Sequence, residues 1–175
     1  MYRVDKRIYD VGGIIFPSGT SYQDELSFDY QKQKIEQILH KVRPEDKEAD
    51  RKTELFVFQE LADAIRFACL MSNSKIYKVK PVDDTKVFHR GDMNLTETMS
   101  RLLDNETALN QLAALYWSGS KTFKPCWECI VNKMQVDSIV VGSIEERNKL
   151  SHDFHSSAKS NIENLKFYIE NLKLN

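Results

Sequence analysis

The segment Trp127-Glu128-Cys129-Ile130-Val131 places one carboxylate inside a run of residues that is otherwise typical of a β-strand. Apolar and β-branched residues surround Glu128, so the pattern predicts a short strand. Charged side chains are rarely buried without a partner or a task. Glu128 therefore faces either water on a one-sided sheet or a polar cleft, and this segment alone leaves both interpretations open.

Two upstream segments set polar residues beside predicted strands. Residues 2–7 alternate apolar and charged side chains, which predicts a strand that carries Arg3 on the face opposite its apolar residues. Leu55 to Phe58 predicts a compact apolar strand, and helical spacing of apolar residues over 61–69 follows at once. The second strand is thus expected to pass directly into a helix.

The rest of the chain completes an α+β order, in which strands lie at both ends of the domain and helices are inserted between them. Further strands are predicted at 76–79, 87–93 and 136–141, and helices at 35–42 and at 95–116, the last with a break near 104–105. Residues 14–16 are a brief apolar segment that a turn ends. Residues 44–52 are nearly all charged and are predicted to form a solvated loop or a frayed helix end.

Length and composition favour one domain. A chain of 175 residues with 41% hydrophobic content can bury a core but is short for two independent domains. We assign residues 1–141 to that domain and 142–175 to a C-terminal amphipathic helix. With 25 basic and 26 acidic residues the net charge is −1, which gives no overall bias toward nucleic acid or membrane. No apolar run approaches the roughly 20 residues of a membrane span and no secretory signal is visible, so we expect a cytoplasmic protein and no membrane partner.

The C-terminal segment carries an apolar stripe that must be buried somewhere. From Leu150 to Leu172 apolar residues recur at steps of three or four, as on one face of a long helix. Fewer than three heptads are sustained, which favours packing on the domain over a coiled coil. A neutralising partner protein or a second copy of the chain is the alternative cover.

The three cysteines do not indicate a disulfide framework or a zinc site. Their number is odd, and Cys126 and Cys129 lack a second ligand pair at matching spacing. On a strand, residues three apart point to opposite faces, so this pair would not chelate one ion. No metal is expected.

In order along the chain, Tyr2-Arg3-Val4, the strand-to-helix segment Phe56-Val57-Phe58-Gln59 and the Glu128 strand resemble elements of the ADP-ribosyltransferase superfamily. The resemblance spans most of residues 1–141 and implies a split β-sheet core with inserted helices and a C-terminal helical extension. Phe58-Gln59 replaces the common serine or threonine corner, and Cys126 stands two residues before Glu128 where arginine-modifying relatives carry a second acidic residue or glutamine. The chain is therefore closer to small relatives with a single late glutamate.

The resemblance implies NAD as the substrate and assigns a site. Glu128 would be the catalytic carboxylate, and Arg3 would hold the pyrophosphate. Gln59 would lie at the corner of the second strand. A nicotinamide ring needs flat apolar walls, and the candidates are Tyr22, Phe58, Tyr116 and Trp117. For each aromatic residue, packing in the core is the competing interpretation, and for Arg3 it is an ion pair with Asp5.

The expected function is an NAD-dependent ADP-ribosyltransferase that modifies a macromolecular acceptor, a protein or a nucleic acid, as a bacterial toxin, effector or defence protein. An NAD glycohydrolase needs the same pocket and stays open. The alternative is a non-catalytic module with the same fold, which binds nucleic acid or a partner protein. Lys78 and Lys80 on the strand at 76–79 would form its basic face, although lysines also protect edge strands from pairing.

Overall fold

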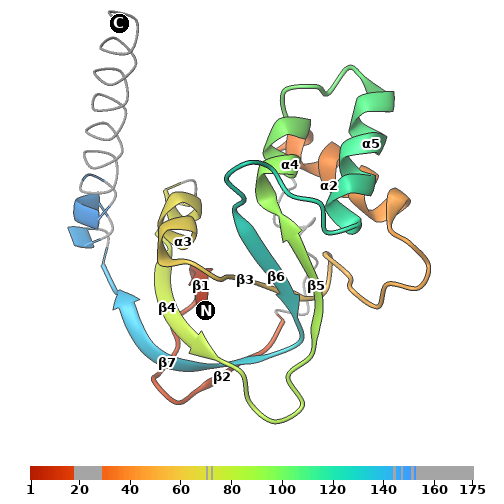
Figure 1. Ribbon diagram of the computed structural model, residues 1–175. Coiled ribbons are helices and arrows are strands. Elements are labelled where there is room, and N and C mark those ends of the chain that lie inside the picture. The colour runs from red at the N-terminus through yellow and green to blue at the C-terminus, as the bar shows by residue number, and fades with distance from the viewer. Residues whose placement is uncertain are drawn as a thin grey trace, which may run out of the picture.

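The computed structural model describes residues 1–17, 29–69, 71, 73–143, 145–146, 148–150 and 152. They form an α+β fold built on one antiparallel sheet of seven strands in the order β2-β7-β4-β1-β3-β6-β5 (Figure 1). The strands are β1 (Tyr2–Asp5), β2 (Ile14–Ile15), β3 (Leu55–Phe58), β4 (Lys75–Lys80), β5 (Val87–Asp92), β6 (Trp127–Val131) and β7 (Met134–Val141). The α+β class predicted from the sequence is confirmed.

The three segments that the sequence singled out lie side by side in the sheet. Strand β3 pairs with β6 over four residues, and Phe58 stands opposite Glu128. Strand β1 is the other neighbour of β3, but the two pair only at Tyr2 and Phe58. Beyond that point β1 continues along β4. The sheet therefore opens between β1 and β3, next to the strand that carries Glu128.

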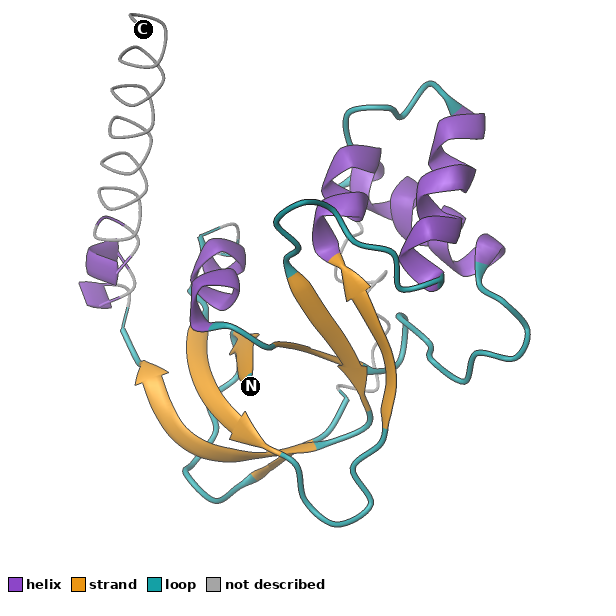
Figure 2. Cartoon of the chain, in the orientation of Figure 1, coloured by secondary structure: helices purple, strands orange, loops and turns teal. Residues whose placement is uncertain are grey.

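The helices with defined bounds are α2 (Tyr30–Val42), α3 (Leu61–Ala68), α4 (Met93–Met99) and α5 (Glu106–Trp117). The described residues from 145 to 152 are also helical. Figure 2 shows α2, α4 and α5 grouped near β5 and β6, whereas α3 lies near β4 on the other half of the sheet. Side-chain caps define three of the helix starts, because Asp29, Asp92 and Asn105 each accept a hydrogen bond from a first-turn backbone N–H. Each half of the sheet thus has its own helical cover.

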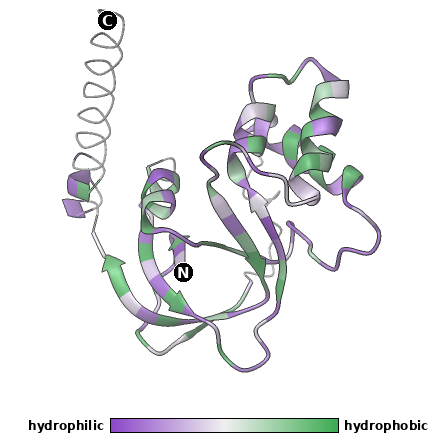
Figure 3. Cartoon of the chain, viewed as in Figure 1, coloured by the Kyte–Doolittle hydropathy of each residue, from purple (hydrophilic) through white to green (hydrophobic). Residues whose placement is uncertain are grey.

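The buried side chains form three clusters, which follow from alternation along the strands. Below α2, α4 and α5 the core contains Ile130 of β6 with Leu39, Leu109 and Trp117. Below α3 it contains residues of β1, β3 and β4. The third cluster joins β2, β3, β4, β6 and β7. Figure 3 shows the corresponding bands of hydrophobic and hydrophilic residues along the strands and helices.

Most predicted elements are confirmed, several of them with shifted boundaries. The strands at 55–58 and 127–131 have the predicted limits. The helix predicted over 95–116 consists of α4 and α5, separated by the irregular residues 100–105. The strand at 76–79 is β4, which lies between β7 and β1. The interpretation of its lysines as protection of a sheet edge is therefore wrong, because β4 has a partner on both sides.

The prediction of a solvated loop at 44–52 is wrong at its most important residue. The segment forms no helix or strand, as expected. However, Ala49 is fully buried and Arg51 is 9% exposed. The charge of Arg51 is neutralised by buried carboxylates described below, which is what allows a guanidinium inside the fold.

Two predictions lie wholly or largely outside the described residues. The first is the predicted ring contact at Tyr22. The amphipathic helix at 142–175 is the other, since only a few of its residues are described. Among these, Leu150 packs against the cluster below α3.

Candidate functional site

A cavity of about 650 Å³ opens where β1 and β3 diverge. Its walls come from β1, β3 and β6, from α2, α3 and α4, and from residues 51–54. Arg3, Phe58 and Glu128, which the sequence predicted to form one site, all line it. The volume falls within the range of small-molecule and cofactor sites.

Glu128 is held from one side by two donors. Glu128 is only 3% exposed. The carboxylate oxygen Oε1 accepts a hydrogen bond from Arg51 Nη1 at 2.5 Å and another from the Tyr116 hydroxyl at 2.8 Å. Among the described residues the other oxygen, Oε2, receives no hydrogen bond. Because a carboxylate oxygen readily accepts two hydrogen bonds, Oε2 keeps its accepting capacity, and Glu128 lines the cavity.

Arg51 connects Glu128 to a second buried carboxylate. Its Nε and Nη2 donate to the two oxygens of Glu36 on α2, at 2.9 and 2.8 Å, in a bidentate pair. The rings of Phe56 and Tyr116 lie 4.6 and 5.0 Å from the guanidinium carbon. Burial alone would lower the pKa of Arg51, but Glu128 and Glu36 outweigh it and hold the pKa well above the usual value. Arg51 is therefore a permanent buried cation.

Arg3 is fixed by its neighbour on β1. Its Nε and Nη2 donate to Asp5, and its Nη1 donates to the carbonyl of Phe56 at 2.8 Å across the opening in the sheet. Arg7 also forks onto Asp5. Burial would raise the pKa of Asp5, but Arg7 and Arg3 outweigh it and hold the pKa well below the usual value. Arg3 therefore lines the cavity, as predicted, and also forms the ion pair with Asp5 that was the competing interpretation.

Aromatic side chains provide an apolar wall. Phe56, Phe58 and Phe67 all line the cavity. The rings of Phe58 and Phe67 are 5.1 Å apart between centroids, so β3 and α3 contribute one tilted aromatic pair. Such a wall accepts a flat apolar or heteroaromatic group. Neither Phe56 nor Phe67 was among the ring contacts predicted from the sequence.

Tyr116 and Trp117, two further predicted ring contacts, are not on the cavity wall. Tyr116 is fully buried and Trp117 is 1% exposed. Tyr116 supports Glu128 from behind through its hydroxyl, and Trp117 donates from its indole nitrogen to the carbonyl of Leu39 on α2. Gln59 follows β3 and bonds through its backbone N–H to the carbonyl of Trp127. These three residues shape the site as core or strand-end residues and are absent from its wall.

His89 and Asp92 lie on β5 and are buried. The Nε2–H of His89 donates to the carbonyl of Tyr116 at 3.1 Å. Burial lowers the pKa of His89 to about 4. Asp92 accepts from the backbone N–H groups of Asn94, Thr122 and Cys126 and from the Thr122 hydroxyl. Both residues therefore have structural partners.

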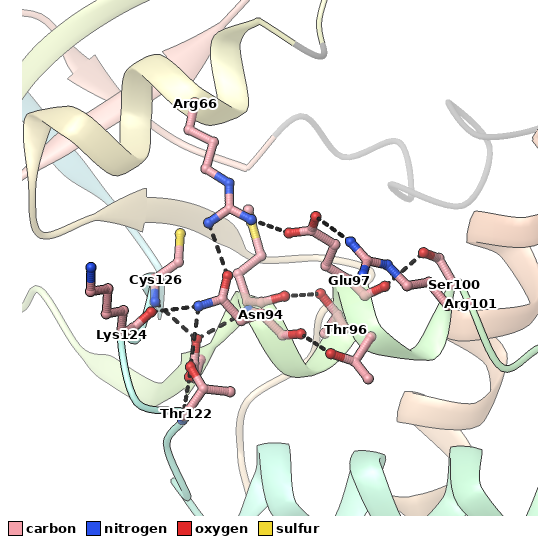
Figure 4. Close-up of polar contacts among 12 residues, drawn as sticks. Arg66, Asn94, Thr96, Glu97, Ser100, Arg101, Thr122, Lys124 and Cys126 are labelled. Carbon is pink, nitrogen blue, oxygen red and sulfur yellow. Dashed lines mark hydrogen bonds and ion pairs between the residues drawn. The ribbon is translucent and has the colours of Figure 1, made fainter. Parts of the chain in front are cut away.

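A polar bridge joins α3 to α4 near the cavity. Arg66 of α3 donates to Asn94 at 2.9 Å and pairs with Glu97, which lines the cavity (Figure 4). Asn94 in turn donates to the carbonyl of Lys124 and the hydroxyl of Thr122 in the segment that precedes β6. The bridge thus ties the two halves of the fold together beside the opening in the sheet.

Sequence reasoning missed Arg51 and Glu36. Arg51 was hidden in a charged run where neighbouring charges face water, and Glu36 stands between apolar residues of α2, Ile35 and Ile38, as an ordinary helix residue would. The position of Glu36 beside the apolar stripe was the available signal, since a carboxylate there is drawn toward the core. Its partner could not be found from spacing alone.

Cys126 lies just before β6 and Cys129 lies on that strand. Cys126 belongs to the cluster below α3, whereas Cys129 packs in the cluster that joins β3 and β7. Burial raises the pKa of both thiols. Within the described residues no group of three or more histidine, cysteine or acidic side chains is arranged to hold a metal ion.

A comparison of the sequence with protein-family models finds no match, and a comparison with curated proteins finds no relative. In the described part of the chain, every helix is too short or too polar to cross a bilayer. The geometry of the cavity therefore carries the functional argument.

Proposed function

We propose that the chain is an NAD-dependent ADP-ribosyltransferase, with Glu128 as the catalytic carboxylate and Arg3 as the NAD anchor. The observation that carries the proposal is that Glu128 and Arg3, 125 positions apart in the chain, line one cavity at an opening in the sheet. The sheet order supports it further, because the strands that carry Arg3, Phe58 and Glu128 are consecutive in space.

Glu128 has the chemistry that the reaction needs. Cleavage of the bond between nicotinamide and ribose develops positive charge on the sugar ring. A carboxylate that accepts a hydrogen bond from a ribose hydroxyl stabilises that charge more in the transition state than in the ground state. With Oε1 held by Arg51 and Tyr116, Oε2 would accept the hydroxyl.

The β1 end of the cavity suits a pyrophosphate. Arg3 and Arg7 share Asp5, so their guanidinium groups are held in fixed directions at the wall. Lys6 and Lys52 also line the cavity. Because Nε and Nη2 of both guanidinium groups donate to Asp5, their remaining N–H groups would bind the phosphate oxygens, and the fixed side chains would lose little entropy in doing so. Phe58 and Phe67 would then contact the nicotinamide or adenine ring.

We propose a macromolecular acceptor, protein or nucleic acid, and a role as a toxin, effector or defence protein. A glycohydrolase would use the same groups and differ only in the nucleophile that attacks the ribose. The lysine face gives little support to the non-catalytic alternative, because Lys78 and Lys80 both pair with Asp137. Such a face presents a partly neutralised surface to phosphate.

The test is incubation of the purified protein with NAD labelled in its adenylate part, in a lysate divided into nuclease-treated and protease-treated halves. We expect label on one class of macromolecule and a loss of labelling of about 100-fold or more in Glu128→Gln, by the scale of lost transition-state stabilisation. Free ADP-ribose alone would indicate a glycohydrolase.

Glu97→Gln is the matched control. Glu97 also lines the cavity, but it lies on the exposed bridge to Arg66 and faces α3. Its variant is expected to retain labelling within about threefold, the scale of surface electrostatic effects. Equal labelling by wild type and Glu128→Gln, or no turnover by wild type in any fraction, would move the assignment to a binding module.

A further inference from the structure

Glu36 is almost as buried as Glu128 but is absent from the cavity wall. It is 7% exposed and lies on α2 behind Arg51. A buried carboxylate is costly unless it is paired and hydrogen-bonded. Its position is therefore explained only by its partner, Arg51, which does line the cavity.

The guanidinium of Arg51 cannot turn without losing contacts on both sides. Two of its nitrogens are fixed by Glu36, and the third, Nη1, donates to both Glu128 and the Tyr116 hydroxyl. Because the guanidinium is planar, fixing two of its nitrogens also fixes the direction of the third. The bidentate pair with Glu36 thus decides where Glu128 Oε1 is held.

The charge balance adds to this restraint. Two carboxylates, Glu36 and Glu128, share one guanidinium in a site where water does not screen them. Without Arg51 the two carboxylates would repel each other, and only the Tyr116 hydroxyl would still hold Glu128 Oε1. A lysine at position 51 would supply the charge but not the three fixed donor directions.

We propose that Glu36 and Arg51 are a pair of positioning residues that hold Glu128 with Oε2 available to the cavity. The geometric part of the proposal stands on the contacts above, and its effect on turnover rests on the proposed function. Glu36 acts on Glu128 indirectly, because Arg51 lies between the two carboxylates. The site would thus depend on α2, a helix that supplies no carboxylate to the cavity itself.

The kinetic test compares Glu36→Gln and Arg51→Lys with wild type. Misplacing a reacting group by about 1 Å can cost about 100-fold in rate, so we expect kcat to fall about 10- to 100-fold in each variant. The KM for NAD should stay within about threefold, because the NAD anchor at Arg3 is untouched. Arg43→Lys is the control, because Arg43 bonds to Ala49 and Asp50 in the same loop and does not line the cavity. A raised KM with unchanged kcat would overturn the proposal, since Arg51 would then bind the ligand directly.

A second measurement does not depend on NAD. Crystal structures of wild type and both variants would locate the Glu128 carboxylate, which we expect to shift by about 1 Å or more in each variant, the scale that matters for catalysis. An unmoved carboxylate in both variants would contradict the positioning role even if turnover fell. If wild type does not use NAD, the proposed function fails while the crystal structures still decide the positioning. Glu36→Gln keeps the guanidinium and the shape of the side chain, so it provides a folded variant if Arg51→Lys does not fold.

Discussion

Arg51 and Glu128 are 77 positions apart in the chain, and Arg51 Nη1 donates to Glu128 Oε1 at 2.5 Å inside the fold. The guanidinium comes from an irregular loop and the carboxylate from the middle of the sheet. Breaking a buried pair of this kind typically costs 3–5 kcal/mol, because the remaining charge is left without a partner. The site is therefore coupled to the stability of the whole domain.

Gly91→Ala should destabilise the protein through the same cluster. Gly91 stands opposite Glu128 on β5, and an added Cβ would overlap the ring of Tyr116, which is fully buried and has no room to move. Overpacking of this kind costs about 1–3 kcal/mol or more. Denaturant unfolding would measure it. Gly142→Ala is the control, because its nearest neighbour would be at 3.6 Å, an ordinary contact, and a loss as large as that of Gly91→Ala would rule out the overlap as the cause.

His89 should make stability fall with acid between about pH 6.5 and pH 4. Its folded pKa of about 4 lies below the unfolded value of 6.5, so the unfolded chain binds the proton first as the pH falls. Stability from neutral His89 is complete above 6.5 and is lost as the pH approaches 4, by about 3 kcal/mol. Wild type and His89→Gln would be unfolded in urea across this range. The glutamine can still donate to the Tyr116 carbonyl. The free energy of unfolding of the variant should therefore fall less between pH 6.5 and pH 4 than that of wild type. Identical pH profiles would show that His89 is not the group responsible.

Asp92→Asn should cost far more stability than Arg66→Ala, although both residues belong to the network around Asn94. Asp92 is fully buried and accepts four hydrogen bonds, three of them from backbone N–H groups. Losing the charge and one acceptor oxygen leaves a donor unsatisfied, at about 2–3 kcal/mol. The Arg66 pair with Glu97 is partly exposed and should contribute no more than about 1 kcal/mol. Thermal unfolding of both variants at low and high salt would compare them, and a larger loss in Arg66→Ala would reverse the ranking.

Arg3→Lys should weaken NAD binding and leave the chemical step largely intact. Lysine keeps the charge but cannot donate to both Asp5 and the Phe56 carbonyl in a fixed direction. We expect the KM for NAD to rise about 10-fold, because one charge-assisted contact is lost. The kcat should stay within about threefold. Steady-state kinetics would separate the two constants. Arg101→Lys, on an exposed pair with Glu97, should change neither, and a fall in kcat with unchanged KM would assign Arg3 a different role.

The sequence predicted the elements better than their contacts. The β3 and β6 boundaries were predicted from apolar runs and turn residues, because such local signals act over a few residues. Arg3, Phe58 and Glu128 were predicted to share a site, and all three line the cavity. Tyr116 and Trp117 were placed on its wall in error, because an aromatic residue at the end of a helix looks the same whether it faces a ligand or the core.

What the sequence by itself determined is the α+β order, the strand around Glu128 and the strand-to-helix passage after Phe58, since periodicity and β-propensity are local properties of the chain. Only the tertiary structure decided which charges meet. The pairing of β3 with β6 fixes the face of Glu128, and the return of the loop after α2 brings Arg51 between Glu36 and Glu128. No spacing rule encodes that meeting, because a guanidinium in a charged loop is stable in water or, with two carboxylates around it, inside the fold.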